Sequence, residues 1–426
     1  MRKERTVSAL RRIVHEVREV DLGDLTRYER GRLVVGRDGV EAAFADPALA
    51  GVWAHTVSPG ERVRIVAPMD VVEPRTKGPG GGGVFPGMLA PADGRRGRDT
   101  HVLRGAAVLA AGHLPRNQEG LVDMSGPAAA LSPFGGTRNV VVEFDRAEGA
   151  SFEEVDDAVR RGLLRLAVHL ADAAVEAPAD DVEELPDLRR LAAASDGLPR
   201  VGVVTNLQTQ GAFKDVFVYG RSLARCLPTL FDPAELEDGA VVSGQYGHPA
   251  LRNPTWMHQN HPVIAALRAR DGRDLRFAGL VLCPEPIDQA AKQHVSAHAA
   301  WVCRTAGFDA AVVTKEGAGN ADSDLSLKLE ALEAYGIRAV GLFAEMSGPD
   351  GTGPPVVSPP RRGAMVSLGN YDQRLQLPAV ERSLGGDQLR IASADATAAV
   401  EVPVAAVLCA LSPLGWGRLT CLQEVR

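Results

Sequence analysis

The sequence has few aromatic residues, few lysines and no long apolar run. Of its 426 residues 5% are aromatic, and only six of the 47 basic residues are lysine. No run approaches the roughly 18 apolar residues of a membrane-spanning helix, and the charged first 20 residues lack the apolar core and cleavage site of a secretory signal. We therefore expect a cytoplasmic protein that neither enters a membrane nor is exported.

Cysteine is sparse as well, and positive charge is not in excess. Five widely spaced cysteines form no C-x-x-C pair, which argues against a disulfide framework and against a zinc knuckle. The 47 basic and 54 acidic residues give a net charge of −7, so the chain lacks the basic field typical of nucleic-acid binding. The scarcity of lysine fits a coding bias toward arginine and alanine, and it restricts any Schiff-base lysine to six candidates.

Up to residue 147 the pattern predicts a mostly β domain. Short β-branched runs are separated by glycine and proline, as in strands joined by turns. The glycine-rich string GPGGGG (Gly78–Gly83) inside this region predicts a loop, either a plain surface connection or one that approaches a ligand. The predicted strands are Arg32–Val35, Arg62–Val66, Val71–Glu73, His101–Ala110 and Asn139–Phe144.

Residues 148–198 are predicted to be a helix followed by an acidic connector. The helix, at about 152–176, places apolar residues three and four positions apart on one face, and the connector spans Asp180–Asp187. The residues of the apolar face are Val155, Val159, Leu163, Leu166 and Leu170.

From residue 199 to 426 the pattern predicts a doubly wound, Rossmann-like α/β domain with a largely parallel sheet. Apolar runs alternate with helical stretches, as in strands joined by crossover helices. One helix is expected over Asp324–Tyr335, capped by Asp322 or Ser323 and ended by Gly336. The predicted strands are Val201–Thr205, Ala240–Ser243, Phe277–Cys283, Ala310–Thr314, Ala339–Phe343 and Ala364–Leu368.

Ligands of open α/β sheets bind at the carboxyl ends of the strands, where this chain has three polar loops. They are Asn206–Gly211, Gly244–Asn260 and Lys315–Asp324. The last, KEGAGNADSD, lacks the third glycine of a dinucleotide fingerprint, so it predicts either a small polar ligand or simple helix capping. For a ligand, the candidates in this loop are Glu316, Asn320, Asp322 and Asp324.

Metal, hydrolase and nucleotide chemistry have little support. His294 and His298 lie four apart but lack the glutamate of H-E-x-x-H, and His248, His258 and His261 are irregularly spaced, so we expect no metal. No G-x-S-x-G elbow and no phosphate-binding G-x-x-x-x-G-K-[ST] occurs.

Eight strings, in order, resemble the precursor of the α and β subunits of component B of the glycine, sarcosine and betaine reductases. The resemblance covers roughly residues 60–370, and the D-proline reductase precursor is related. The strings are RIVAPMDVVEPRTK (Arg64–Lys77), GGGVFPGML (Gly81–Leu89), THVLRGAAVL (Thr100–Leu109), QEGLVDMSG (Gln118–Gly126), LQTQG (Leu207–Gly211), LEDGAVVSG (Leu236–Gly244), NPTWMHQNHPVI (Asn253–Ile264) and KEGAGNADSDL (Lys315–Leu325).

This resemblance implies reductive cleavage of a carbon–nitrogen bond next to a carboxylate. In the family the precursor cleaves itself at a cysteine, which becomes a pyruvoyl group that captures the substrate amine. A partner subunit supplies a thiolate or selenolate that displaces the amine.

The chain departs from the family where the cysteine belongs. The family has Asn and Cys after the glycine that corresponds to Gly244, whereas Gln245 and Tyr246 stand here. A pyruvoyl group forms by loss of the heteroatom from the β-carbon of Cys or Ser, which tyrosine cannot undergo, and Ser243 is out of register. None of the five cysteines is expected near this loop, so we expect an uncleaved chain without a pyruvoyl cofactor.

Two functions remain open. In the first, the chain is an enzyme subunit of a hetero-oligomer that binds a small α-substituted acid, such as a quaternary amine, without a Schiff base. Tyr246, His258 and His248 would be catalytic, with Tyr246 protonating the leaving group and His258 orienting it or acting as acid or base. The substrate-binding candidates are Gln245, Asn253, Gln208, Gln210, Glu316, Asn320 and Asp322.

In the second, the site is degenerate and the chain is a structural or regulatory partner of the thiol- or selenol-bearing subunit. A lysine Schiff base at Lys315 or Lys214 is a third possibility.

Overall fold

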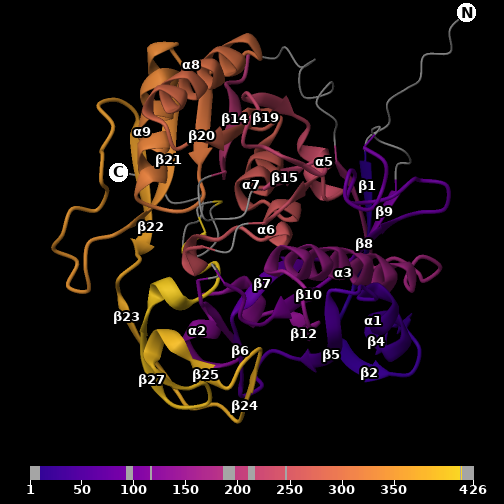
Figure 1. The fold of residues 1–426 in the computed structure, drawn as a ribbon. Coiled ribbons are helices and arrows are strands. Elements are labelled where there is room, and N and C mark those ends of the chain that lie inside the picture. Colours follow the sequence, from indigo (N-terminus) through magenta and orange to yellow (C-terminus); the bar gives the residue numbers. More distant parts are fainter. Residues whose placement is uncertain are drawn as a thin grey trace, which may run out of the picture.

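The computed structural model describes residues 10–92, 99–115, 118–185, 197–209, 216–244, 247–412 and 414. It confirms the α/β class, with a strand-rich N-terminal half and a largely parallel C-terminal sheet. In Figure 1 the parallel sheet occupies the upper part of the molecule, β5, β6, β10 and β12 of the N-terminal half lie in the lower part, and β1 and β9 lie at the right. Within the described ranges no helix is long and apolar enough to cross a membrane.

The N-terminal half is built from four small sheets. Their strand orders are β13-β1-β9-β8, β5-β12-β10-β7, β11-β6-β24 and β2-β4-β3. The elements of this half are β1 (Leu10–Glu16), β2 (Glu19–Gly23), β3 (Arg27–Glu29), β4 (Arg32–Gly36), α1 (Arg37–Ala43), β5 (Leu49–Val57), β6 (Val63–Val66), β7 (Pro68–Val72), β8 (Arg75–Lys77), β9 (Asp99–Arg104), β10 (Ala106–Ala111), β11 (Leu121–Asp123), α2 (Gly126–Ala129), β12 (Arg138–Arg146), α3 (Phe152–Asp172) and β13 (Asp181–Leu185).

Helix α3 supplies the core of this half, and its predicted apolar face is confirmed. All five predicted residues of that face are buried against strands of two of the sheets. The helix begins with a capping box, in which Ser151 Oγ accepts from the Glu154 backbone N–H at 3.2 Å and Glu154 Oε2 accepts from the Ser151 N–H at 2.8 Å. The position of the helix therefore follows from periodicity and capping alone.

Two local predictions for this half are wrong. The acidic stretch predicted as a connector contains strand β13, which pairs antiparallel with β1 from Leu10 to Val14. The run predicted as one strand over 101–110 is two strands, β9 and β10, because Gly105 between them has a φ of 86°.

The C-terminal half centres on a six-stranded sheet of order β17-β19-β14-β20-β21-β22, parallel except for the edge strand β17. Helices α8 and α9 pack on one face and α7 packs on the other, so the sheet is doubly wound. The elements are β14 (Arg200–Gln208), β15 (Phe217–Val218), β16 (Arg221–Ser222), β17 (Thr229–Phe231), α5 (Pro233–Glu237), β18 (Val241–Val242), α6 (Thr255–Gln259), α7 (Pro262–Arg270), β19 (Arg276–Glu285), α8 (Gln289–Thr305), β20 (Ala310–Thr314), α9 (Asn320–Ala334), β21 (Arg338–Glu345) and β22 (Ala364–Asn370).

Five of the six predicted strands lie in this sheet, and the sixth does not. The run Ala240–Ser243 forms β18, which pairs with β15 in a separate small sheet. The helix predicted from Asp324 begins four residues earlier, at Asn320, because Gly319 with a φ of 68° turns the chain directly into α9.

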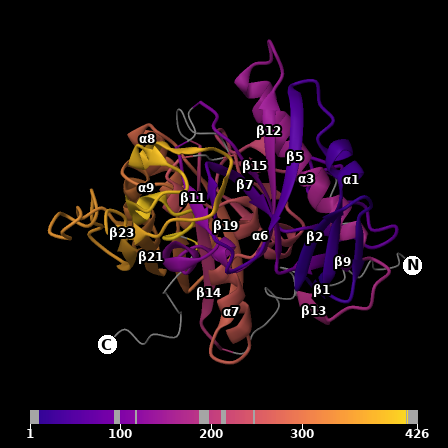
Figure 2. The ribbon, with the colours of Figure 1, turned by 90° about the horizontal axis from the view of Figure 1, so that it is seen from below.

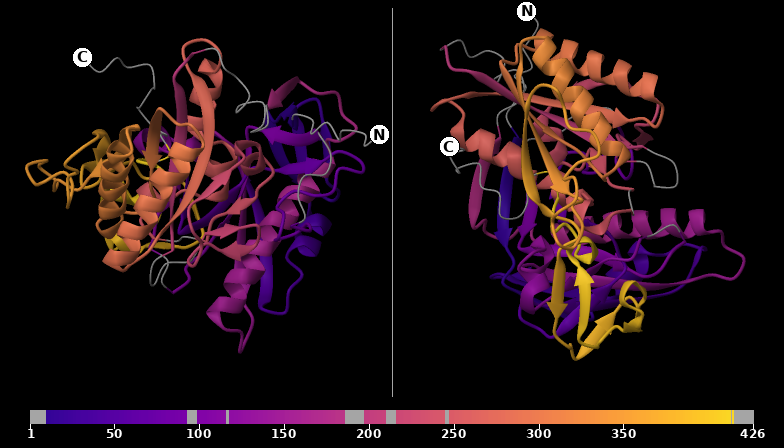
Figure 3. Two further views of the ribbon diagram at one scale, coloured as in Figure 1. Left: turned by 90° about the horizontal axis from the view of Figure 1, so that it is seen from above. Right: turned by 90° about the vertical axis from the view of Figure 1, so that its left-hand side faces the viewer.

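The segment from Arg374 to Ser412 returns to the N-terminal half (Figures 2 and 3). Strand β24 pairs in parallel with β6, and the Leu408 N–H donates to the Leu121 carbonyl at 2.9 Å. The predicted domain limits, 1–147, 148–198 and 199–426, stay a prediction, although this pairing joins the last segment to the first. Its elements are β23 (Arg374–Leu377), β24 (Arg382–Leu384), β25 (Gln388–Leu389), β26 (Ala394–Asp395) and β27 (Val400–Pro403).

The side chain of Arg64 on β6 forms hydrogen bonds with this returning segment. Its guanidinium pairs with Asp123 at 2.7 Å, and both side chains are fully buried. The same guanidinium donates to the carbonyls of Ala396, Ala398 and Pro378 at 2.8–3.1 Å. One side chain on β6 thus binds both the turn between β26 and β27 and the residue that follows β23.

We predict that Arg64→Leu lowers the free energy of unfolding by about 3–5 kcal/mol, because it leaves the Asp123 carboxylate buried without a counter-charge. The matched control is Arg62→Leu on the same segment, whose ion pair with Glu381 at 3.3 Å is exposed and contributes at most about 1 kcal/mol. Urea unfolding of both variants measures the difference, and equal losses would contradict this role for Arg64.

Asp70 on β7 anchors α6 in a similar way. It accepts from the Thr255 N–H at 2.8 Å and from the Thr255 hydroxyl at 2.6 Å. Burial raises the pKa of Asp70 to about 6, although these hydrogen bonds oppose the shift. The folded state therefore holds a proton on Asp70 that the unfolded state releases near its ordinary value of 3.8.

We predict that the free energy of unfolding of the wild type, relative to that of the variant Asp70→Asn, falls as the pH rises from about 4 to about 6. The pKa of Asp70 is higher in the folded than in the unfolded state, so its contribution to the free energy of unfolding is complete below the unfolded pKa. As the pH rises through the folded pKa, up to about 3 kcal/mol of that contribution is lost. Unfolding of both proteins across this pH range tests the sign, and a constant difference would contradict it.

Candidate functional site

Three neighbouring strands of the parallel sheet end in buried polar side chains. Asn206 and Gln208 end β14, Glu285 ends β19, and Lys315 and Glu316 directly follow β20. Their exposed fractions are 0–3%. Gln208 lies opposite Glu285, and Thr205 opposite Thr314, so the register of β14 brings these groups to one edge of the sheet.

Glu316 connects the polar loops at this edge. Its Oε2 accepts from the Gln208 backbone N–H at 2.7 Å, and its Oε1 lies 3.5 Å from Nε2 of His258 on α6. The Glu316 N–H in turn donates to Glu285 Oε1 at 3.4 Å. The carboxylate of Glu316 therefore contacts residues of β14 and α6, and its backbone N–H contacts β19.

Buried ion pairs surround this carboxylate. Lys315 Nζ lies 2.5 Å from Asp322 Oδ1, and on α8 Lys292 pairs with Asp324. Lys328 Nζ is 3.8 Å from the other oxygen of Asp324. Such pairs rarely improve stability over apolar packing, because desolvation of each charge costs several kcal/mol. The arrangement is therefore better explained by function.

Several polar atoms in this cluster have no hydrogen-bond partner. Within the described ranges both amide atoms of Asn206 and Glu285 Oε2 are buried without one, and Glu316 Oε1 has only the contact with His258. A buried unpaired polar atom costs about 1–3 kcal/mol. Burial, together with the carboxylates of Asp324 and Glu316, holds the pKa of Glu285 well above its usual range. Donors and acceptors are thus left for a ligand to satisfy.

Four residues named from the sequence lie at this edge. Asn253 Nδ2 lies 3.4 Å from the Lys315 carbonyl and thereby joins Gln208, His258 and Glu316. Asn253 Oδ1 also accepts from the Ser412 hydroxyl at 2.7 Å. Contacts therefore link all three predicted polar loops.

His248 lies close to the same edge. Its ring packs edge-on against Tyr371 with 6.3 Å between centroids. Burial lowers the pKa of His248, the positive charges of Lys315 and Arg252 lower it further, and the carboxylate of Asp322 opposes them. The imidazole is therefore within electrostatic range of the Lys315–Asp322 pair.

The loop after β20 serves two purposes. The N-cap of α9 is Gly319 and not Asp322 or Ser323 as predicted; Asp322 lies at the third helical position, where its Oδ2 accepts from the Gly319 N–H at 3.0 Å and its other oxygen pairs with Lys315. Asn320 is exposed at the first position of α9. The Lys315 amino group also donates to the Gly317 carbonyl at 2.7 Å, so it is engaged on two sides.

Four candidates lie outside the described residues: Gln210, Lys214, Gln245 and Tyr246. Among the residues that the structure does describe, no group of three or more His, Cys, Asp or Glu side chains could hold a metal ion. His261 instead caps α7, where its Nδ1 accepts from the Ile264 N–H at 3.4 Å.

Sequence reasoning missed Glu285, Lys292 and Lys328. Glu285 ends the strand whose apolar run was predicted to stop at Cys283, and a carboxylate two residues beyond such a run was the available signal. The prediction that none of the five cysteines is near the Gly244–Asn260 loop is wrong. Cys409 Sγ lies 3.2 Å from the Arg252 carbonyl, because the end of the chain folds back onto this loop.

Comparisons with known proteins place the chain in one family. Residues 9–422 match the family model of the glycine/sarcosine/betaine reductase component B subunits. No solved structure matches.

Curated relatives agree over nearly the whole chain. The glycine reductase complex component B subunits alpha and beta of Peptoclostridium acidaminophilum are 34% identical over 415 residues, which is 95% of this chain and 97% of the relative. The sarcosine reductase complex component B subunit alpha of the same organism is 33% identical over 87% of each chain, and the betaine reductase counterpart is 29% identical over 95% and 97%. The chain therefore belongs to the family of glycine/sarcosine/betaine reductase component B subunits.

Proposed function

We propose that the chain is the substrate-binding subunit of a reductase complex that cleaves a C–N bond next to a carboxylate. The observation that carries this proposal is the buried cluster at the ends of β14, β19 and β20, where Asn206 and Glu285 keep unpartnered polar atoms. The family supports the reaction class. A separate thiol- or selenol-bearing subunit completes the hetero-oligomer.

The chain carries out this function without self-cleavage and without a pyruvoyl group. Only Cys and Ser lose a β-carbon heteroatom to give pyruvoyl, whereas positions 245 and 246 are Gln and Tyr. The nearest described serine, Ser243, is buried beside β18 with its N–H donating to the Thr255 hydroxyl at 2.9 Å. No residue at the expected position therefore fits the group.

The unpartnered atoms favour a ligand with both an N–H and a carboxylate. Glu316 Oε1 can accept from an ammonium N–H, Glu285 Oε2 can do so once the positive charge of the ligand favours the ionised carboxylate, and Asn206 Nδ2 can donate to a carboxylate. A quaternary amine has no N–H to give and would leave the carboxylate oxygens unsatisfied. We therefore favour a primary or secondary α-ammonium acid over the quaternary amine that the sequence first suggested.

In the proposed reaction the partner's thiolate or selenolate attacks the α-carbon and forms a C–S or C–Se bond. The C–N bond breaks, and the amine leaves with the bonding electron pair. Glu285 and Glu316 orient the ammonium group, His258 holds Glu316 in place, and Tyr246 and His248 are candidates for proton transfer at the departing nitrogen.

A non-catalytic role as structural or regulatory partner is the alternative. The replacement of the family's Asn and Cys by Gln245 and Tyr246 favours it. Such a partner would bind the thiol- or selenol-bearing subunit equally well with or without a small ligand, whereas a substrate-binding subunit is stabilised by its ligand through mass action.

The first test is intact-mass spectrometry of the protein expressed together with the thiol- or selenol-bearing subunit. We expect a single species of 45.1 kDa, the mass of the continuous chain. Two fragments that meet near residue 245 would contradict the uncleaved state and restore a pyruvoyl mechanism.

A second test follows ligand stabilisation in the intact chain and in Asn206→Leu. We expect glycine or sarcosine to raise the melting temperature of the wild type more than betaine does. Asn206→Leu abolishes this shift and leaves the free protein as stable or up to about 2 kcal/mol more stable, because it removes unpaired buried polar atoms.

Asn253→Leu is the matched control, since Asn253 has partners for both amide atoms. It should destabilise the free protein by about 1–3 kcal/mol. Equal destabilisation by the two variants would contradict a ligand role for Asn206, and an absence of any ligand shift in the wild type would favour the non-catalytic alternative.

A further inference from the structure

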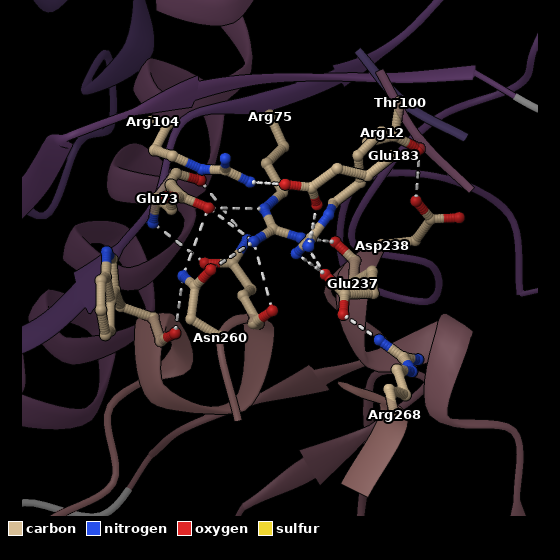
Figure 4. A network of polar contacts seen from close by, with 12 residues as sticks. Arg12, Glu73, Arg75, Thr100, Arg104, Glu183, Glu237, Asp238, Asn260 and Arg268 are labelled. Atoms are coloured by element: carbon tan, nitrogen blue, oxygen red, sulfur yellow. Dashed lines mark hydrogen bonds and ion pairs between the residues drawn. The ribbon is translucent and has the colours of Figure 1, made fainter. Parts of the chain in front are cut away.

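A second cluster of charged side chains lies where β1 and β13 of the N-terminal half meet α5 and α7 (Figure 4). It borders a cavity of about 560 Å³ whose lining includes Arg12, Arg104 and Arg268. This volume is within the range of small-molecule sites. The lining includes none of the strand-end residues Asn206, Glu285 and Glu316, so the cavity is separate from the candidate substrate site.

Two carboxylates of this cluster, Glu237 and Glu183, each pair with more than one guanidinium. Glu237 pairs with Arg12 at 2.9 Å, with Arg75 at 2.9 Å and with Arg268 at 2.8 Å. Burial alone would raise the pKa of Glu237, yet the three guanidiniums lower it to about 2. The carboxylate is therefore ionised and fully committed to its arginines.

Glu183 is shared in the same way. It pairs with Arg12 and, through its other oxygen, with Arg104 at 2.6 Å. Within the described ranges no oxygen of Glu183 or Glu237 is buried without a partner. These two carboxylates thus have no acceptor to spare for a further donor.

Donors remain, and all of them belong to arginines. Nε and Nη2 of Arg268 and Nε of Arg12 are buried without a hydrogen-bond partner. Arg268 uses Nη1 for Glu237, so the unpartnered pair is the side of the guanidinium that presents two parallel N–H groups. This fork matches the two oxygens of a carboxylate or phosphate.

We propose that this cavity is a binding site for a small oxyanion, a carboxylate or a phosphate group, held by the Nε/Nη2 fork of Arg268 and by Nε of Arg12. Glu184 and Asp271 also line the cavity and would repel a large polyanion, so a compact ligand is favoured. The unpartnered buried atoms of Arg12 and Arg268 are all donors, and the ligand contributes the acceptors that they lack.

The position of the cavity relates it to the candidate substrate site. His261 lines the cavity, and its Nε2 lies 3.5 Å from the hydroxyl of Thr205 near the end of β14. Three residues earlier, His258 contacts Glu316. A bound oxyanion would therefore rest against the same turn that carries His258.

The test is a thermal titration of the full-length chain with inorganic phosphate, sulfate and acetate, each compared with sodium chloride at equal ionic strength. We expect at least one oxyanion to give a saturable rise in melting temperature beyond the chloride control. Saturation by phosphate and sulfate alone assigns a tetrahedral oxyanion, and saturation by acetate assigns a carboxylate. A melting temperature that follows ionic strength alone overturns the proposal.

Two variants show whether the fork is responsible. Arg268→Lys keeps the charge toward Glu237 but cannot present two parallel N–H groups, so we expect the apparent Kd to rise about tenfold or more. Arg374→Gln, at an exposed pair 3.9 Å from Glu401, should leave the Kd unchanged. Equal affinity in Arg268→Lys and the wild type overturns the site even if an oxyanion binds. Neither measurement uses reductase activity, so its outcome is independent of the proposed function.

Discussion

The position of β14 is the constraint on which the rest of the structure depends. This strand precedes residues 245 and 246, yet it is hydrogen-bonded on one edge to β19 and on the other to β20, both of which follow them. The pairing of β6 with β24 makes a second such connection. Backbone hydrogen bonds therefore hold the two parts of the chain together independently of the peptide bonds at residues 245 and 246.

The same register determines the chemistry at the strand ends. Because β14 has a parallel strand on each side, Asn206 and Gln208 lie between Glu285, at the end of β19, and the consecutive residues Lys315 and Glu316, which follow β20. Beyond the carboxyl ends of parallel strands the backbone offers few hydrogen-bond partners. Polar side chains there therefore interact with one another or with a ligand. The ion pairs of Lys292 and Lys315 keep the remaining charges compensated while Asn206 stays unpartnered.

Periodic features could be predicted from the sequence, and long-range ones could not. The apolar face of α3 and the strands of the parallel sheet were correct, because burial on one face or on both faces leaves a local pattern. Strand β13 was missed because it is an edge strand whose partner, β1, lies about 170 residues away and whose DVEEL sequence is mostly acidic. The return of the last segment to β6 rests on the pairing of β24 with β6 and on hydrogen bonds from the buried Arg64 to carbonyls of that segment, and neither has a periodicity to reveal it.

The candidate site shows the same division. Loops at strand ends were a sound guide to Glu316, Gln208, Asn253 and His258, since the topology of an α/β sheet brings such loops together. Glu285 was missed, because a glutamate just past an apolar run is common on a protein surface and becomes significant only when three dimensions show it buried. Differences of a few tenths of an ångström between donor and acceptor decide which polar atoms lack a hydrogen-bond partner. No sequence pattern encodes such distances.

The lysines give a last physical indication that the strand-end cluster is not accidental. Coding bias explains why the chain has only six lysines, but it does not explain where they are. All four that the structure describes, at positions 77, 292, 315 and 328, are buried, and each lies within 4 Å of a carboxylate. An arginine needs acceptors for five N–H groups and room for a planar fork, whereas a lysine places one compact charge beside one carboxylate. Composition otherwise favours arginine, yet three of these four buried lysines, Lys292, Lys315 and Lys328, pair with carboxylates beside the ends of β14, β19 and β20.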